Sequence, residues 1–412
     1  MPDLSILVIN SGSSSIKFST FHATAAEKTQ LFDGAVDGIG TDNARFHIKS
    51  ADGQKIVDEK PRIANTAEAF QLVAEAVQKP PFPKPDAIGH RMVAGGPRLK
   101  THQRITPDVL GEMKRYVGFA PLHNPTALYI MHRAEELFFG VPNFVCFDSA
   151  FHTTIPEVAA RFAIPESYWD QGIRRYGAHG ISCESTIYQL AENVPPRLII
   201  AHLGNGCSVT AVKDGKSADT SMGLTPTGGV ISGTRTGDID PGVLLYILRD
   251  LKPDDSKRHG GSAPLTRESA ANTLEKLVNK QSGMFGTSEG LSDMRDLRNA
   301  AKQGKPLAKM AVDQFTYVLR KFIGSYIAIL GGLDTLVFTG GIGEHDPATR
   351  QEVCAGLEAF QINLDDDLNQ SPQPDANGLA TISAAESAVR VMVIPAKEDL
   401  MIADHVSSLM YA

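Results

Sequence analysis

The feature of this chain that most limits its fold is a strand–turn–strand pattern that occurs twice, almost half a chain apart. Leu7–Phe18 reads Leu-Val-Ile-Asn-Ser-Gly-Ser-Ser-Ser-Ile-Lys-Phe, and Ile199–Val212 reads Ile-Ile-Ala-His-Leu-Gly-Asn-Gly-Cys-Ser-Val-Thr-Ala-Val. Each is an apolar run, a turn of small residues and a second run, which is typical of a β-hairpin. The repetition predicts a duplicated domain whose two hairpin turns face each other across a cleft. Chance similarity of two hairpins is the alternative.

The first of these turns also indicates a chemistry. It runs through four serines to Lys17, so backbone N–H groups, hydroxyls and one ammonium group can surround a single anion, and phosphate suits them best. The spacing is not that of a Walker loop, because Gly-x-x-x-x-Gly-Lys is missing and no helical pattern follows. Ile16, Phe18 and Phe21 instead resume a strand. An ordinary hairpin with a serine-rich turn is the second interpretation of this segment.

Length and composition describe a globular protein with two domains, or three. A chain of 412 residues is too long for one ordinary core. The net charge of −7 gives no electrostatic reason to expect nucleic acid or a membrane as a partner. The apolar run at Phe322–Leu333 falls short of the roughly 18 residues of a membrane span, and no signal peptide is expected. The four cysteines are far apart, so we expect neither disulfides nor a zinc site, and a cytoplasmic location.

Strand-like runs alternate with helical patterns, which predicts an α/β protein. Strands are expected at Leu4–Ile9, Ala87–Arg91, Phe144–Phe147, Arg197–Leu203, Thr335–Phe338 and Val389–Ile394. Helices are expected near Thr66–Val77, Thr126–Phe138, Ser185–Leu190, Gly242–Leu251, Ser269–Gln281 and Pro306–Gly331. Surface loops are expected at Gln78–Pro85, Lys252–Pro264 and Asp365–Gly378.

Four further segments concentrate polar residues where a core does not require them. Arg91 ends a strand among glycines, and Asp148 ends another strand, a position that ligands favour in open α/β sheets. Within Asp219–Pro241, Arg235 lies among small residues, and the interspersed apolar residues favour a packed loop over a linker. Phe338–Glu344 runs from a strand into a glycine turn that suits a nucleotide, although this signal alone is weak. Together these groups fit phosphoryl transfer, in which the enzyme mainly positions groups and neutralises oxygen charge.

In combination, the motifs of this chain resemble those of the acetate kinase family. They are Asn10–Lys17, Gly89–Arg91, Pro121–Pro125, Phe147–His152, His202–Gly206, Gly233–Pro241, Ser292–Asp296, Gly341–Glu344, Ile394–Pro395 and Glu398–Leu400. The resemblance spans the chain and implies an α/β fold of two related ribonuclease-H-like (actin-like ATPase) domains, each a βββαβαβα core, with a cleft between them. It implies domains at 1–150 and 151–396, the second binding nucleotide and forming a dimer, and a final helix at about 397–412 that packs on the first domain.

The resemblance also implies a reaction and its participants. The reaction is reversible, Mg²⁺-dependent, direct in-line transfer of a phosphoryl group from ATP to acetate, giving acetyl phosphate and ADP. The expected partners are ATP and a short-chain carboxylate, Mn²⁺ is an alternative metal, and a cytoplasmic homodimer is implied. Catalytic roles fall to Arg91, Asp148, His179 and Arg235, of which His179 and Arg235 would stabilise the transition state. The metal would be held by Asn10, Asp148 and Glu398.

The same resemblance assigns the binding residues. The acid would contact Arg91, Val93, Leu122, Ala178 and Pro226. The nucleotide would contact Asn10, Ser13, Ser15, Lys17, His202, Leu203, Gly204, Asn205, Gly206, Asp293, Met294, Arg295, Gly341, Ile342, Gly343 and Glu344. His123 would line the cleft together with His202.

Four departures from the family pattern leave the substrate and the function open. Ala94, Ala178, Cys183 and Gly228 stand where the family usually has His, Phe, His and Glu. Ala178 matters most, because the family's ring packs on the acetate methyl group and each buried CH₂ is worth about 0.8 kcal/mol. Propionate or a longer acid is therefore the alternative substrate. A sugar kinase, which needs a base for its hydroxyl acceptor, and a non-catalytic ATP switch are two further functions that the same fold could carry.

Overall fold

The computed structural model describes residues 3–12, 14–25, 27–251 and 266–411, which form two compact units. Unit 1 comprises Met1–Glu192 and Ala396–Ala412, and unit 2 comprises Asn193–Pro395. Residues 151–192 therefore lie in unit 1, whereas the sequence analysis placed them in the second domain. The physical reason is that their main helix, α6 (Gly180–Leu190), packs against the C-terminal helix α15 (Glu398–Tyr411).

The sheet of unit 1 has the strand order β5-β4-β3-β2-β1-β6-β8-β7. Its strands are β1 Leu4–Ser11, β2 Ser15–Ala23, β3 Lys28–Asp37, β4 Arg45–Ser50, β5 Lys55–Glu59, β6 Ala87–Met92, β7 Gln103–Arg104 and β8 Asn143–Phe147. Strands β1 to β3 form an antiparallel meander, while β6 pairs parallel to β1 and β8 pairs parallel to β6. The carboxyl ends of β1, β6 and β8 consequently lie at one edge of the sheet.

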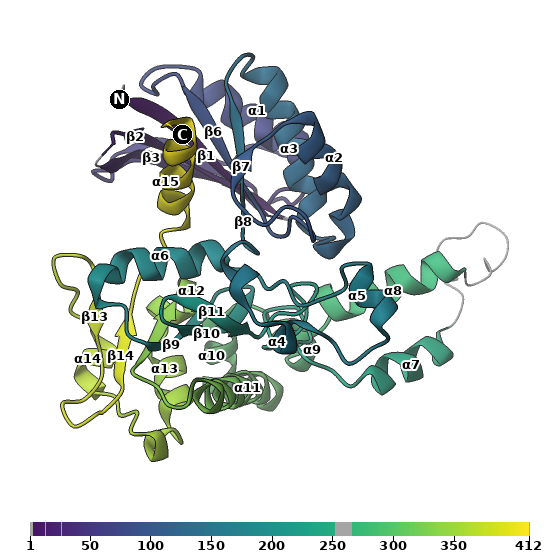
Figure 1. The fold of residues 1–412 in the computed structure, drawn as a ribbon, viewed down its shortest axis with the longest axis vertical. Helices are drawn as coiled ribbons and strands as arrows, with labels where there is room; N and C mark the ends of the chain where they lie inside the picture. The colour runs from purple at the N-terminus through teal and green to yellow at the C-terminus, as the bar shows by residue number, and fades with distance from the viewer. Residues whose placement is uncertain (1–2, 13, 26, 252–265, 412) are drawn as a thin grey trace. The chain divides into compact units, whose positions relative to one another are not determined.

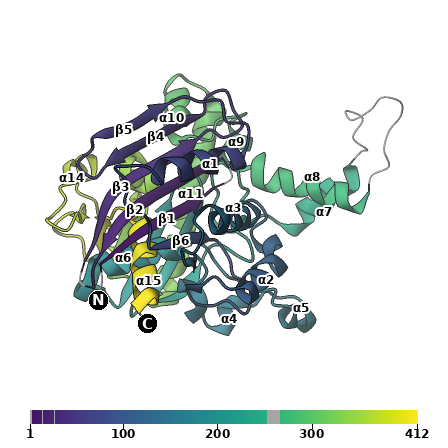
Figure 2. The ribbon, with the colours of Figure 1, turned by 90° about the horizontal axis from the view of Figure 1, so that it is seen from above.

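Helices cover both faces of this sheet. The helices of unit 1 are α1 Thr66–Val77, α2 Pro107–Arg115, α3 Asn124–Leu137, α4 Glu157–Ala160, α5 Glu166–Asp170, α6 and α15, and α1, α3 and α15 contact the sheet. On β1, Leu7 and Ile9 pack with α1 and α3, whereas Ile6 and Val8 pack with α15 on the opposite face (Figures 1 and 2). Burial on both faces explains why β1 reads as a continuous apolar run.

The sheet of unit 2 repeats this plan, with the order β11-β10-β9-β12-β14-β13. Its strands are β9 Arg197–Leu203, β10 Cys207–Lys213, β11 Lys216–Thr220, β12 Thr335–Thr339, β13 Ala380–Thr381 and β14 Arg390–Val393. Strands β9 to β11 form an antiparallel meander, while β12 pairs parallel to β9 and β14 pairs parallel to β12. The β9–β10 hairpin thus holds the place that β1–β2 holds in unit 1, which confirms the duplicated fold predicted from the two hairpins.

Unit 2 has one large core that includes one face of β9, and its helices differ in how far they contribute to it. The helices are α7 Pro241–Asp250, α8 Arg267–Lys280, α9 Gly283–Thr287, α10 Met294–Lys302, α11 Pro306–Leu330, α12 Gly340–His345, α13 Pro347–Cys354 and α14 Asp366–Gln370. Helix α11 contributes Phe315, Leu319 and Ile323, all fully buried. Short 3₁₀ segments of the chain lie at Val117–Phe119, Phe151–Thr154, Ala191–Asn193 and Glu358–Phe360.

The expected elements agree with this structure except at the start of α6, which begins at Gly180 and not near Ser185, and in one loop. The segment Asp365–Gly378 contains helix α14, whose N-terminus is capped by the Asp365 carboxylate, which accepts from Leu368 N at 2.9 Å. The predicted loop Lys252–Pro264 lies outside the described residues. All four cysteines are free and buried. Within the described ranges, no helix combines the length and apolar character that crossing a membrane requires.

Candidate active site

Arg91 and Asp148 meet at the carboxyl edge of the unit 1 sheet. Arg91 lies in β6 and Asp148 directly follows β8, and the parallel pairing of these strands sets Arg91 opposite Cys146. The guanidinium donates from Nε to Oδ1 at 3.0 Å and from Nη2 to Oδ2 at 2.6 Å. Such a bidentate pair fixes the orientation of both planar groups. Asp148 is fully buried, which raises its pKa, and the charge of Arg91 acts in the opposite direction.

Two further side chains, from β1 and α15, join this pair. Arg91 Nη1 donates to Asn10 Oδ1 at 3.1 Å and lies 3.9 Å from Glu398 Oε2. Asn10 Nδ2 in turn donates to Glu398 Oε2 at 3.3 Å. Although burial lowers the pKa of Arg91, the charges of Asp148 and Glu398 outweigh burial and raise it. The structure therefore brings together the three residues that the sequence analysis assigned to the metal.

A third carboxylate, Asp399, lies beside this group and was not assigned a role from the sequence. Its Oδ2 accepts a hydrogen bond from Ser19 Oγ at 2.6 Å, and burial raises its pKa. Three carboxylates thus face two cationic side chains, Arg91 and Lys17. Carboxylate and amide oxygens together with an excess of negative charge fit a hard divalent cation such as Mg²⁺.

His179 lies at the start of α6 in a left-handed conformation, with φ 59° and ψ 21°. A non-glycine residue in this region is uncommon, and such conformations gather at functional sites. The backbone N–H of His179 donates to the Asp148 carboxylate, and the side chain is buried. His179 is thereby placed beside Asp148, although 31 positions separate them in the chain.

The β1–β2 turn is tight, because Gly12 N donates to Ser15 O at 2.8 Å. Ser15 and Lys17 lie in β2, and Lys17 pairs with Asn10 across the hairpin. Ser13 lies outside the described residues. Backbone and side chains of this turn therefore surround the end of β1 that carries Asn10.

The residues assigned to the acid are divided between the units. Unit 1 holds Val93 and Ala178, both buried, and Leu122, which is partly exposed, while Pro226 belongs to unit 2. The Ala178 carbonyl oxygen is 3.0 Å from His152 Nε2. His123, in the same unit as Leu122, directly precedes helix α3.

In unit 2 the turn after β9 packs on the loop that carries Arg235. Gly233 N donates to Asn205 O at 3.1 Å, and Cys207 N donates to Ser232 Oγ at 3.0 Å. Gly233 packs directly on Asn205, so a Cβ at this position would push against the Asn205 amide group. Arg235 Nη1 donates to Pro226 O at 3.2 Å. These contacts confirm the predicted packed loop. They also bring the turn after β9 close to the loop that carries Arg235.

A cavity of about 520 Å³ lies beside this turn within unit 2. Its lining includes Gly204, Asn205, Asp293, Met294, Arg295, Gly341 and Ile342, all of which the sequence analysis assigned to the nucleotide. The ends of β9 and β12 are neighbours, with Thr339 opposite His202, which explains why the turn after each strand reaches the same cavity. Its size falls in the range of small-molecule sites.

The chain matches known proteins over nearly its whole length. The model described as the acetokinase family matches residues 5–404. The chain belongs to the acetokinase family. Acetate kinase of Thermotoga petrophila is 38% identical over 97% of each chain. Acetate kinase of Porphyromonas gingivalis superimposes with a TM-score of 0.81, 33% identity and coverage of 99% of this chain and 100% of the other. Propionate kinase of Francisella tularensis superimposes with a TM-score of 0.85 and 36% identity, covering 98% of this chain and 100% of the other.

Some residues that the sequence analysis assigned to the nucleotide lie outside the cavity lining. Glu344 accepts a hydrogen bond from Gly340 N at 2.8 Å and so closes the first turn of α12. Leu203 is fully buried in the core, and Gly343 is buried within α12. His202 and Gly206 flank the lining residues Gly204 and Asn205 without joining them.

Four cavity residues were missed from the sequence: Ser292, Arg298, His345 and Asp346. Arg298 bonds to Asp346 Oδ2 at 2.7 Å and to both oxygens of Glu352 at 2.9 and 3.0 Å. Its position four residues after Met294 on one helix was a usable signal, because such residues share a face. His345 and Asp346 continue the turn that begins at Gly341.

Three of the positions where this chain departs from the family pattern are filled by small residues in close contact with their surroundings. Ala94 is buried, and its carbonyl accepts from Asn124 Nδ2 at 3.2 Å. Cys183 is buried in α6. Beside Gly228, Gly229 N donates to Asp238 Oδ1 at 2.7 Å. The departures therefore change side-chain volume without leaving these segments unsupported.

Proposed function

We propose that this chain transfers the γ-phosphoryl group of ATP to the carboxylate of acetate, reversibly, giving acetyl phosphate and ADP. The observation that carries the proposal is the Arg91–Asp148 pair with Asn10, Glu398 and the His179 N–H around it. The names of the relatives support the same reaction.

The pairing of Asp148 favours a carboxylate acceptor over a sugar. Both oxygens of Asp148 accept hydrogen bonds from Arg91, and the His179 N–H donates to the same carboxylate. A carboxylate so engaged is poorly placed to remove a proton from a sugar hydroxyl. Acetate is already ionised at neutral pH and needs no base, so the arrangement suits it.

In the proposed step, an acetate oxygen attacks the γ-phosphorus and the bond from that phosphorus to the β,γ-bridging oxygen breaks. The electron pair leaves with ADP, and no proton has to move. Arg91 and Arg235 bind the carboxylate and the transferring group, because planar forked donors suit both anions. His179 donates to the phosphoryl oxygens. Catalysis then rests on alignment and on neutralising oxygen charge.

Asn10, Asp148 and Glu398 would hold Mg²⁺, directly or through water, in this proposal. Their oxygens and the excess of carboxylates over cationic groups fit this ion. When bound, Mg²⁺ neutralises phosphate charge. Mn²⁺ prefers similar oxygen ligands and is the alternative.

The residues proposed to bind ATP are found in each of the two units. Asp293, Met294, Arg295, Gly341 and Ile342 would contact the nucleoside in the cavity of unit 2. The phosphates would contact Asn10, Ser13, Ser15, Lys17, His202, Leu203, Gly204, Asn205 and Gly206. Gly343 and Glu344 would also contact the nucleotide in this proposal, although neither lines the cavity.

The test is a coupled assay with the purified chain, ATP and Mg²⁺, in which acetate, glucose and glycerol are compared as acceptors. The proposal predicts ADP release with acetate and trapping of the acyl phosphate as its hydroxamate. Turnover with a polyol and none with acetate would contradict it. A cytoplasmic homodimer is part of the proposal, and light scattering on the eluting protein tests the dimer.

A longer acid is the second candidate substrate, and the small side chain of Ala178 favours it. The methyl group is buried, and Ala178 is fixed in place through the His152 contact to its carbonyl oxygen. One structural neighbour is a propionate kinase. We propose that propionate is accepted alongside acetate.

A further inference from the structure

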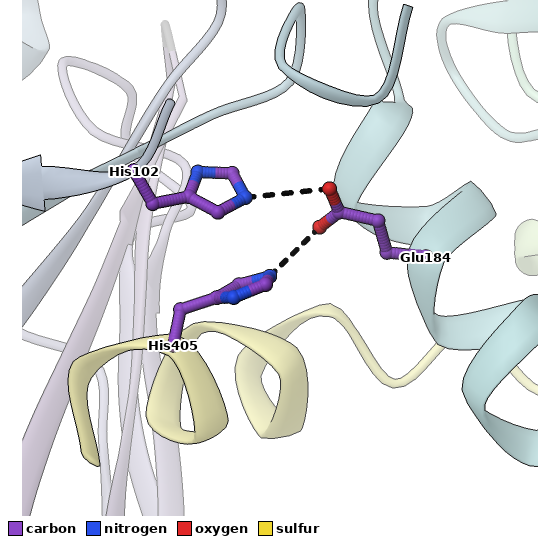
Figure 3. Close-up of side chains that lie close together, drawn as sticks. All are labelled: His102, Glu184 and His405. Carbon is purple, nitrogen blue, oxygen red and sulfur yellow. Dashed lines mark hydrogen bonds and ion pairs between the residues drawn. The ribbon is translucent and has the colours of Figure 1, made fainter. Parts of the chain in front are cut away.

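Three titratable side chains of unit 1, His102, Glu184 and His405, lie close together and have no role in the proposed reaction. Glu184 lies in α6, and its two oxygens take one histidine each (Figure 3). His102 Nε2 is 3.3 Å from Oε1, and His405 Nε2 is 2.9 Å from Oε2. The imidazole rings are 4.0 Å apart between centroids. The three side chains are only 10%, 17% and 24% exposed, so solvent replaces none of these bonds readily.

The backbone fixes the protonation of His102. Phe147 N donates to His102 Nδ1 at 3.1 Å, so Nδ1 has to be the unprotonated nitrogen. The ring proton then resides on Nε2 and is donated to Glu184. A metal ion would need the lone pair of Nε2, and a metal-bound histidine usually donates its other N–H rather than accepting there. The group is therefore a hydrogen-bonded junction, not a metal site.

The junction ties together three elements whose ends carry proposed catalytic groups. His102 holds Phe147, which directly precedes Asp148. Glu184 lies in the helix that begins directly after His179, and His405 lies in α15, which begins at Glu398. These links run through backbone that is rigid in strand and helix.

A second bond and a close approach reinforce the same arrangement. Ser185 Oγ accepts from Lys397 N at 3.0 Å, directly before α15. A Cβ on Gly180 would stand 1.9 Å from Asp148 O, so α6 and the end of β8 are in close contact. A shift of α6 would accordingly move His179 against Asp148.

We propose that Glu184, His102 and His405 are positioning residues that align Asp148, His179 and Glu398 for phosphoryl transfer. The inference rests on the proposed function of those three groups. Because a misplacement of about 1 Å can cost about 10²-fold in rate, a loosened junction lowers kcat more than it changes KM.

The first experiment compares His405→Gln with His405→Asn. The glutamine amide nitrogen can occupy the place of Nε2 and still donate to Glu184, whereas asparagine is too short to reach it. We expect His405→Gln to keep kcat within about threefold of wild type and His405→Asn to lose about tenfold or more, with KM for ATP and acetate within about threefold in both.

Glu184→Gln and Glu184→Leu provide the second comparison. The glutamine carbonyl can accept from His102, and its amide can donate to His405 Nε2 once that ring carries its proton on Nδ1. Glutamine should therefore rescue kcat, and leucine should not. If Glu184→Leu yields no folded protein, the comparison of His405→Gln with His405→Asn alone tests the positioning role.

Asp404→Asn is the matched control. Asp404 neighbours His405 in α15 but pairs with Lys28 Nζ at 2.7 Å on the edge toward β3. The Asp404→Asn variant should have a lower Tm than wild type and an unchanged kcat. Equal kcat in His405→Gln and His405→Asn, or a kcat loss in Asp404→Asn as large as in His405→Asn, would overturn the positioning role. A wild-type chain without acetyl phosphate synthesis would instead refute the proposed function.

Discussion

Arg91 and Asp148 form a bidentate ion pair in which the Asp148 carboxylate is fully buried and the Arg91 side chain is partly exposed. Removal of the cation would leave a buried charge without compensation, which costs about 3 to 5 kcal/mol. We therefore expect Arg91→Leu to lose about that much free energy of unfolding together with its activity. Urea unfolding and the hydroxamate assay measure the two effects.

Arg45→Leu is the matched control for this substitution. Arg45 donates from Nε and Nη2 to the two oxygens of Asp58 at 2.8 and 3.0 Å, but at an exposed site in the same unit. Solvent and salt screen exposed pairs, so a small change in stability and full activity are expected. Equal destabilisation by both substitutions would contradict the importance of burial.

Arg235→Ala should reduce kcat by about 10² to 10³-fold, because it removes a charged donor that is proposed to stabilise the transition-state oxygens. Arg235 is tied by its bond to the Pro226 carbonyl and by the loop at Gly233. Arg390→Ala, on the exposed end of β14, serves as the control and should leave kcat unchanged. Steady-state kinetics separate the two variants, and full turnover by Arg235→Ala would contradict the proposed catalytic role of Arg235.

Ala178→Phe should narrow the range of acids. Each CH₂ that the wild-type pocket buries is worth about 0.8 kcal/mol, and a ring at this position would exclude the longer chains. Hydroxamate assays across C2 to C5 acids are expected to show a gentle decline for wild type and a sharp drop after acetate for the variant. A steep fall after acetate in the wild-type chain itself would eliminate the enlarged pocket.

Glu398→Gln should raise the Mg²⁺ concentration needed for half-maximal activity by roughly tenfold or more, because one charged ligand is lost. Activity titrated against free Mg²⁺ at saturating substrates measures this, and excess EDTA should stop turnover. The exposed Glu386→Gln of unit 2 is the control. An unchanged Mg²⁺ dependence in Glu398→Gln would remove Glu398 from the proposed metal site.

Glu184 should make folding stability depend on pH. Burial raises its pKa, but hydrogen bonds from His102 and His405 lower it from 4.5 to about 2. The unfolded chain therefore binds this proton first, and the stabilisation present above pH 4.5 is lost as pH falls toward 2. Between pH 6 and pH 4, wild type should lose about 1 kcal/mol more unfolding free energy than Glu184→Gln. Equal losses would show that the junction does not hold the carboxylate ionised.

The buried strands and long helices could be predicted because their buried faces require apolar residues in a regular pattern along the sequence. Strand β1 is apolar on both faces, and α1 was predicted with its observed bounds, Thr66–Val77. Strands β3 to β5 were not predicted, because partial exposure gives them a mixed composition that also suits loops. The start of α6 was placed late, since its first residues are small and the left-handed His179 leaves no pattern.

Residues of the proposed site could be predicted where a sequence motif contains them. They could not be predicted where residues far apart in the sequence meet only in the folded structure. Asn205 and Gly341 follow two strands that proved to be neighbours. By contrast, His102 and His405 lie 82 and 221 positions from Glu184. No local pattern links them, because only the packing of α6, α15 and β8 brings them together.

The central claim is that a carboxylate oxygen attacks the γ-phosphorus, and isotope tracing tests it most directly. With acetate labelled by ¹⁸O in both oxygens, the acetyl phosphate formed should carry one ¹⁸O in the bridge to phosphorus, seen as an upfield shift of its ³¹P resonance. An unshifted resonance would mean that the bridging oxygen came from phosphate and that one labelled oxygen left the acyl carbon as water, which would contradict phosphoryl transfer to the carboxylate.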